Sequence, residues 1–119
     1  MKENLIQKKS FEFALRIIKL SKYLNNEKKE FVLSKQILKS GTSIGANVEE
    51  GLGGQSKQDF IAKLQIALKE SRETKYWLRL LSESDVLEKR LADSLIKDSD
   101  ELIKILNSIL KSTKENLKS

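Results

Sequence analysis

Cysteine, histidine and proline are all absent from this chain of 119 residues. Without cysteine the chain has no disulfide, no thiolate metal site and no thiol nucleophile. Without histidine it lacks the commonest zinc ligand and the commonest general base near neutral pH. The absence of proline permits long uninterrupted helices, because no residue fixes φ or lacks the backbone donor. We therefore expect helical structure, no enzymatic activity, and no cofactor or metal ion.

Long hydrophobic runs are missing as well. No apolar stretch reaches the ~20 residues that a membrane span needs. The first residues, Met1–Asn4, lack the basic and then apolar pattern of a signal peptide. We expect a cytoplasmic protein with no membrane partner, and the length of residues 1–119 is that of a single domain.

The hydrophobic residues that are present recur at helical spacing. They predict four helices over about residues 10–24, 27–50, 57–82 and 86–112. Short turns between them favour an all-α, antiparallel up-and-down four-helix bundle. Ser10 is the expected cap of the first helix, and Ser56 that of the third. The predicted core stripe of the first helix comprises Phe11, Ala14, Leu15, Ile18 and Leu24, with Phe13, Ile17 and Leu20 beside it.

The second predicted helix contains glycines in its middle and is followed by more. Its apolar spacing passes straight through Gly41 and Gly45, so we place both inside the helix. Each costs about 1 kcal/mol relative to alanine, which indicates a groove where another backbone approaches closely. Gly51 and the two glycines after it are expected to end the helix, because glycine tolerates the left-handed conformation of a C-terminal cap.

Few side chains suggest chemistry. The carboxylates near the apolar stripes are Glu49, Glu50, Glu70 and Glu73. Two inward glutamates could act as acid and base, but structural hydrogen bonding is the favoured interpretation. Trp77 could stack on nucleic-acid bases, although burial in the core or at a subunit contact is favoured for an indole ring.

The formal charge of +6 is unevenly distributed. Residues 1–30 hold eight Lys and Arg against four Glu, and residues 56–83 hold six against four acids. A surplus on the first and third helices would make a basic face for phosphate backbones. A solvated lysine-rich surface is the alternative. The candidate contacts to RNA or DNA are Lys8, Lys9, Arg16, Lys19, Lys22, Lys63, Arg72, Lys75 and Arg79.

Two blocks carry a family resemblance. The run Ser43-Ile44-Gly45-Ala46-Asn47-Val48-Glu49-Glu50-Gly51 resembles the Ser-Ile-x-Ala-Asn-Ile-x-Glu-Gly signature of proteins encoded in intervening sequences of bacterial 23S ribosomal RNA genes. These are also called S23 ribosomal proteins. The stretch from Phe60 to Leu81, in particular Ala67 to Leu78, resembles the second block of that family. The matching signature positions are Ser43, Asn47, Glu50, Gly51, Glu70, Glu73 and Trp77.

The resemblance covers about residues 8–110. It implies an up-and-down four-helix bundle that assembles into a ring, often a pentamer, and it brings no catalytic residues. The chain is also similar to the accessory variability protein of diversity-generating retroelements, a basic pentamer that binds nucleic acid and its reverse transcriptase. Gly54 stands where many family members have arginine, which weakens a direct transfer of nucleic-acid binding through this loop.

Asn47 and Glu50 are expected to be buried polar anchors against the third helix. The lysine-rich faces, rather than the signature, are expected to hold any ligand. The function that we expect is a non-enzymatic homo-oligomer, with a pentamer favoured, that binds RNA or DNA through a basic surface. The alternative is a structural or protein-binding oligomer that has no role with nucleic acid.

Overall fold

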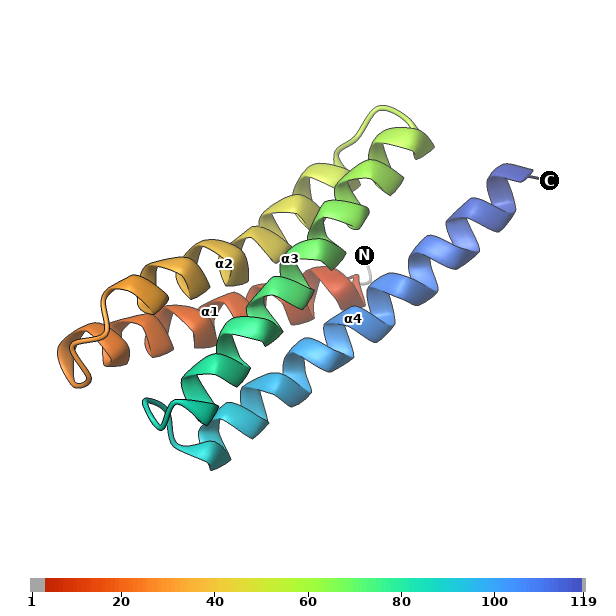
Figure 1. Cartoon of the computed structure of the whole chain (residues 1–119). Helices are drawn as coiled ribbons and strands as arrows, with labels where there is room; N and C mark the ends of the chain where they lie inside the picture. The colour runs from red at the N-terminus through yellow and green to blue at the C-terminus, as the bar shows by residue number, and fades with distance from the viewer. Residues whose placement is uncertain (1–3, 119) are drawn as a thin grey trace.

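The computed structural model describes residues 4–118 and consists of four α-helices joined by short turns. The helices are α1 (Leu5–Asn26), α2 (Val32–Leu52), α3 (Lys57–Glu83) and α4 (Lys89–Lys118). They alternate in direction, and α1 packs against α2 and α4 but lies diagonally across the bundle from α3 (Figure 1). The prediction of an all-α, antiparallel up-and-down bundle is confirmed.

Helix α1 begins earlier than predicted. Its cap is Asn4, whose side-chain oxygen accepts hydrogen bonds from the backbone N–H groups of Ile6 and Gln7. Ser10 is therefore not a cap but a buried residue in the second turn. A small side chain is required there because α2 approaches closely at Gly45.

The predicted core stripe of α1 is right for Leu24, and Phe13, Ile17 and Leu20 beside it are buried, but it is wrong for three other residues. Phe11, Leu15 and Ile18 are 64%, 49% and 37% exposed. The face that packs into the bundle is rotated from the predicted one and carries two serines among its apolar residues. Its buried members are Ile6, Ser10, Phe13, Ile17, Leu20, Ser21 and Leu24.

Helix α2 starts at Val32, five residues later than predicted. The preceding turn contains Lys29 in the left-handed region, with φ of 54°. As predicted, Gly41 and Gly45 lie inside the helix, on the side of α1. A Cβ on Gly41 would lie 2.8 Å from two side-chain carbons of the fully buried Ile17. The two helices therefore approach each other so closely at Gly41 that only glycine fits without displacing Ile17.

The end of α2 differs from the prediction. Gly51 is a buried helical residue, and a Cβ there would lie 3.0 Å from Cδ1 of Leu64. The helix ends at Leu52, and the cap residue Gly53 has φ of −89°. No glycine adopts a positive φ. Glycine therefore serves close packing against α3 here, rather than a left-handed cap.

Helix α3 matches its prediction closely. The Ser56 hydroxyl caps it by accepting a hydrogen bond from the N–H of Asp59, at 3.1 Å. Its buried face is a single stripe at helical spacing: Leu64, Ala67, Ser71, Thr74, Leu78 and Leu81. Helix α4 starts three residues later than predicted and continues past residue 112 to Lys118.

Buried hydroxyl groups join the helices inside an otherwise apolar core. The Ser21 and Ser34 oxygens lie 2.9 Å apart between α1 and α2. The Thr74 hydroxyl lies 2.9 Å from the Ser40 oxygen between α3 and α2. These contacts fix the relative levels of the helices, because a buried hydroxyl needs its partner. None of the described helices is both long and apolar enough to cross a membrane.

Candidate interaction surfaces

Five of the nine predicted nucleic-acid contacts are already engaged with carboxylates of the same chain. Four bridge neighbouring helices, and the fifth is an i,i+4 pair within α3. The pairs are Lys9–Glu101, Arg16–Asp98, Lys63–Glu50, Lys75–Asp100 and Arg79–Glu83. A cation neutralised in this way attracts a phosphate less strongly than a free one.

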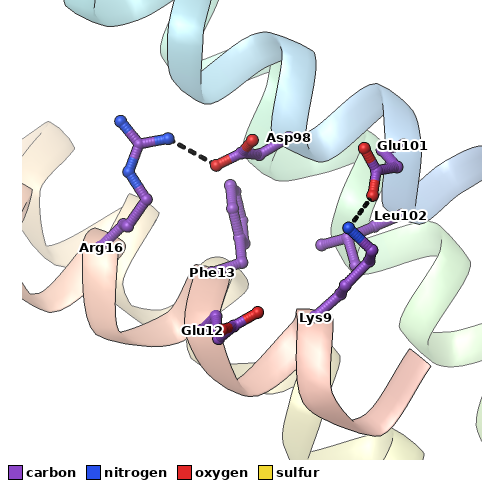
Figure 2. A pocket seen from close by; sticks show the side chains of 7 residues that line it. All are labelled: Lys9, Glu12, Phe13, Arg16, Asp98, Glu101 and Leu102. Carbon is purple, nitrogen blue, oxygen red and sulfur yellow. Dashed lines mark hydrogen bonds and ion pairs between the residues drawn. The ribbon is translucent and has the colours of Figure 1, made fainter. Parts of the chain in front are cut away.

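The first two pairs close the seam between α1 and α4. Arg16 also donates to the Ser94 hydroxyl at 3.1 Å, and Glu101 holds the pKa of Lys9 above its usual value by accepting its hydrogen bond. Figure 2 shows both pairs spanning the seam on either side of Phe13. A cavity of about 90 Å³ lies between the two helices. The seam is therefore bridged by exposed ion pairs and is not filled by close packing.

The other four predicted contacts are Lys8, Lys19, Lys22 and Arg72, which are exposed. None of them forms an ion pair with a carboxylate within residues 4–118. The first three lie on α1 and Arg72 lies on α3, the helix diagonally opposite. The expectation that α1 and α3 would share one basic face is therefore wrong, because their outer surfaces point in opposite directions.

A different group of cations gathers where α1 meets α2. Lys19 and Lys22 lie in the last two turns of α1, and three further lysines follow in the turn and at the start of α2. We call this group the basic end; it comprises Lys19, Lys22, Lys28, Lys29 and Lys35. All five are exposed, and none is in an ion pair with a described carboxylate.

The acids near the basic end neutralise it only partly. Glu27 is exposed, and Glu30 accepts a hydrogen bond from the N–H of Leu33 at 2.9 Å. Lys35 was missed in the sequence because residues 31–55 balance two cations against two acids. Those acids, Glu49 and Glu50, lie at the opposite end of α2. Lys35 is recognised from its exposure and its position along the helix. The net charge of residues 31–55 does not reveal it.

The signature residues of α2 are not the buried anchors that we expected. Glu50 is exposed and pairs with Lys63 of α3 at 3.2 Å. Asn47 is half-buried and donates to the carbonyl of Ser43 one turn earlier, at 2.8 Å. Only Gly51 of this group is fully inside the bundle. The signature residues of α2 therefore bond within the helix and allow α3 to approach it closely. The ion pair of Glu50 lies at the surface and is not buried.

The signature residues of α3 lie on its outer side toward α2. Glu73 is exposed and Glu70 is half-buried. Partial burial raises the pKa of Glu70, and the neighbouring Glu73 raises it further, while Lys69 and Lys39 oppose the rise. Trp77 is half-buried, and its indole N–H is buried without a hydrogen-bond acceptor.

A shallow groove runs between the outer edges of α1 and α2. Phe11 and Ala14 form one wall, and Thr42, Gly45 and Ala46 form the other. The groove measures about 230 Å³. A hydrogen bond of 2.6 Å from Gln7 to Glu49 lies at one end. The predicted close approach at Gly45 is thus between helices of one chain, with an apolar groove beside it.

The carboxylates of the sequence-based acid–base hypothesis do not meet in one pocket. Glu49 lies at the α1–α2 groove, Glu50 pairs with α3, and Glu70 and Glu73 lie on the outer side of α3. Within residues 4–118 there is no cluster of three acids that could hold a metal ion. Among the described residues, the pair that interacts is Glu70 and Glu73, which lie together on the outer side of α3.

Comparisons with known proteins agree with this architecture. The family model described as "23S rRNA-intervening sequence protein" matches residues 2–108. A crystal structure from Bacteroides thetaiotaomicron VPI-5482, described as a protein of unknown function from the S23 ribosomal protein family, is 54% identical. The match covers 90% of this chain and 99% of that one, with a TM-score of 0.89. Comparison with curated protein sequences gives no significant match. The chain therefore belongs to the 23S rRNA-intervening sequence protein family.

Proposed function

We propose that this protein is a non-enzymatic homo-oligomer that binds RNA or DNA through the basic end. The observation that carries the proposal is the group of five exposed lysines that form no ion pair with a carboxylate within residues 4–118. Contact with phosphates releases counterions, which favours binding without sequence specificity. A single small patch of this kind binds weakly, so several copies in one ring, with a pentamer favoured by the family resemblance, would strengthen the attraction.

Apolar side chains on the outside of the bundle support the homo-oligomer. Phe11, Leu15 and Ile18 lie on one side of α1, and further exposed apolar residues lie on α3. Single exposed apolar residues are ordinary, whereas groups of them mark contact surfaces. The same feature favours the second candidate function, a structural or protein-binding oligomer with no role with nucleic acid. The two candidates differ in one measurable property, which is the affinity for phosphate backbones.

The test is a titration of labelled RNA and DNA strands of the same sequence against the wild-type protein at low and moderate salt. The variant K22Q/K28Q/K29Q removes three charges from the basic end. The matched control K97Q/K104Q/K111Q removes three exposed charges from α4. We expect wild-type binding that weakens with salt, and a log–log salt slope reduced by about 2–3 in the basic-end variant. The α4 variant should stay within about threefold of wild type.

Two results would contradict the proposal. Absence of binding at low salt would leave the structural oligomer as the function. Equal losses in the two triple variants would show that net charge, rather than the basic end, governs binding. The mass of each variant in solution is measured in parallel, so that a loss of binding is not confused with a loss of assembly.

A further inference from the structure

The turn between α1 and α2 exposes a phenyl ring among the lysines of the basic end. Phe31 is 61% exposed, and the next residue, Val32, is 70% exposed. Phe31 directly precedes α2, at one end of the bundle, where the turn is drawn in orange (Figure 1). A single exposed apolar residue is ordinary, so the groups around the ring decide what it can bind.

Phe31 shares one side of α2 with Lys35. Its backbone angles are helical, and its carbonyl accepts a hydrogen bond from the N–H of Lys35 at 3.3 Å. Residues four positions apart on a helix lie one above the other, with about 5–6 Å between their Cβ atoms. The same spacing continues through Leu38 to Thr42, which lines the groove between α1 and α2. Phe31 and Lys35 therefore flank the outer side of the α1–α2 seam.

Lys22 reaches the same seam from α1. The hydroxyl oxygens of Ser21 and Ser34 lie 2.9 Å apart, and Lys22 and Lys35 are the next residues of the two helices. Lys22 also follows Phe11 by about three helical turns, so it shares the helix face of Phe11, which lines the α1–α2 groove. The two lysines therefore lie at one level, on the two sides of the outer seam.

The turn holds two further lysines at the end of the bundle. A hydrogen bond of 2.9 Å from the N–H of Glu30 to the carbonyl of Leu24 closes the turn. Lys28 and Lys29 lie within it, both exposed. Because the turn is closed by this bond, the two lysines are held between the end of α1 and Phe31.

The acids at this end leave a surplus of positive charge around the ring. Glu27 is exposed, whereas Glu30 is half-buried and its carboxylate is bound to the N–H of Leu33. Glu83, at the end of α3, pairs with Arg79, and α3 packs on α2 and α4 without contacting α1. The five lysines of the basic end thus face two local carboxylates, one of which is tied to the backbone.

A ligand that fits this end carries both anionic groups and flat apolar faces. Single-stranded nucleic acid has both, because its phosphates alternate with bases whose π faces are free to stack on an aromatic side chain. A duplex keeps its base faces inside its own stack, so it offers phosphates and no partner for the ring. A membrane surface would hold the turn through buried apolar area, of which two side chains supply little.

We propose that the basic end binds single-stranded nucleic acid, with one base stacked on Phe31 and the adjacent phosphates held by Lys22 and Lys35. The inference rests on the proposed function and names the form of nucleic acid that this end takes. Lys28 and Lys29 extend the contact to phosphates beyond the turn. Every base has a π face, so binding of this kind tolerates any sequence.

The test compares single strands with duplexes of the same length at low salt. The probes are labelled oligo(dT) and oligo(U), and their duplexes with oligo(dA) and oligo(A). F31A and F31L remove the ring, and F31W keeps an aromatic face. The control V32A shortens the neighbouring exposed side chain, which has no ring. Circular dichroism and the mass in solution verify that each variant keeps the fold and assembly of wild type.

We expect wild type to bind the single strands more tightly than the duplexes. F31A and F31L should weaken single-strand binding about 5- to 100-fold, the range that loss of one base–aromatic stack gives. Duplex binding should not change in either variant. F31W and V32A should bind as wild type does. The salt slope should stay the same in all four variants, because none of them loses a charge.

Other outcomes overturn the inference in distinguishable ways. Single-strand binding of F31A equal to that of wild type would overturn it and leave the proposed function intact, since the lysines would still bind phosphates. Tighter binding of the duplexes would do the same. Full binding by F31L, or an equal loss in V32A, would show apolar contact in place of stacking.

Two outcomes would reach further. Binding to vesicles of phosphatidylcholine and phosphatidylserine that depends on Phe31, with no binding of the strands, would assign this end to a membrane surface and overturn the inference. Absence of binding to single strands and duplexes alike would overturn both this inference and the proposed binding of nucleic acid.

Discussion

Helix α1 meets its two neighbours through different chemistry. Toward α2, Gly41 receives the buried side chain of Ile17, and a pair of buried serine hydroxyls lies nearby. Toward α4, exposed ion pairs such as Arg16–Asp98 bridge a cavity. Steric fit sets the first seam and is insensitive to salt, whereas exposed charges in water set the second and are screened by salt. The stability contributed by the first seam should therefore be independent of salt, whereas that of the second should fall as salt rises.

The largest effect is expected at the tight seam, from Gly41→Ala. The added Cβ would lie 2.8 Å from Ile17, which is fully buried and cannot withdraw. We expect the free energy of unfolding to fall by about 1–3 kcal/mol through overpacking, measured by urea unfolding at fixed protein concentration.

Gly45→Ala is the control one turn later in the same helix. Its Cβ would lie 3.4 Å from the Ser10 oxygen, which is an ordinary contact. The variant should be neutral or gain up to about 1 kcal/mol from helix propensity. Equal destabilisation by both alanines would show that the tight seam is not set by Gly41.

An intermediate effect is expected from Ser34→Ala, which leaves the buried Ser21 hydroxyl without its partner. The free energy of unfolding should fall by about 1–2 kcal/mol, equally at low and high salt. Ser108→Ala, at an exposed site on α4, should change it by less than about 0.5 kcal/mol. A loss at Ser34 that disappears at high salt would contradict the distinction between the seams.

The smallest effect is expected at the α1–α4 seam. A double-mutant cycle of Arg16→Gln and Asp98→Asn should give a coupling of about 0–1 kcal/mol, because both side chains are more than a third exposed. The coupling should shrink when salt rises from about 0.1 M to about 1 M, as the screening length falls to ~3 Å. A coupling free energy above about 2 kcal/mol, or one that salt leaves unchanged, would show that this ion pair behaves as a buried pair that stabilises the fold.

The sequence predicts α3 well and α1 poorly for a physical reason. In α3, Ser56 marks the start and a single stripe from Leu64 to Leu81 carries the core. In α1, apolar residues occur at helical spacing on two faces, and both satisfy the same periodicity. The face that is buried includes Ser10 and Ser21, which hydropathy disfavours. This face is buried because Ser10 and Ser21 contact Gly45 and Ser34 of α2. The hydrophobic pattern of α1 alone carries no information about those contacts.

The charged surfaces were predictable only in part. Lys19 and Lys22 form no ion pair with a described carboxylate, but Lys9 and Arg16 pair with acids of α4. The sequence segment of that helix, residues 84–119, holds seven cations against seven acids and gave no sign of this pairing. The number of charged residues in a sequence segment describes its composition. It does not show which side chains meet between two helices. Glu50 likewise is recognisable as a signature position, whereas its exposed contact with Lys63 follows from the packing of α2 on α3.

The order of helix contacts along the chain has a consequence for folding kinetics. The contacts α1–α2, α2–α3 and α3–α4 all join helices adjacent in sequence, and only the α1–α4 seam joins distant segments. Chains dominated by local contacts fold in microseconds to milliseconds. Closing the long loop between α1 and α4 costs entropy that exposed ion pairs offset only slightly. We therefore expect this seam to close last during folding and to open first in native fluctuations, while the α2–α3 hairpin keeps its structure.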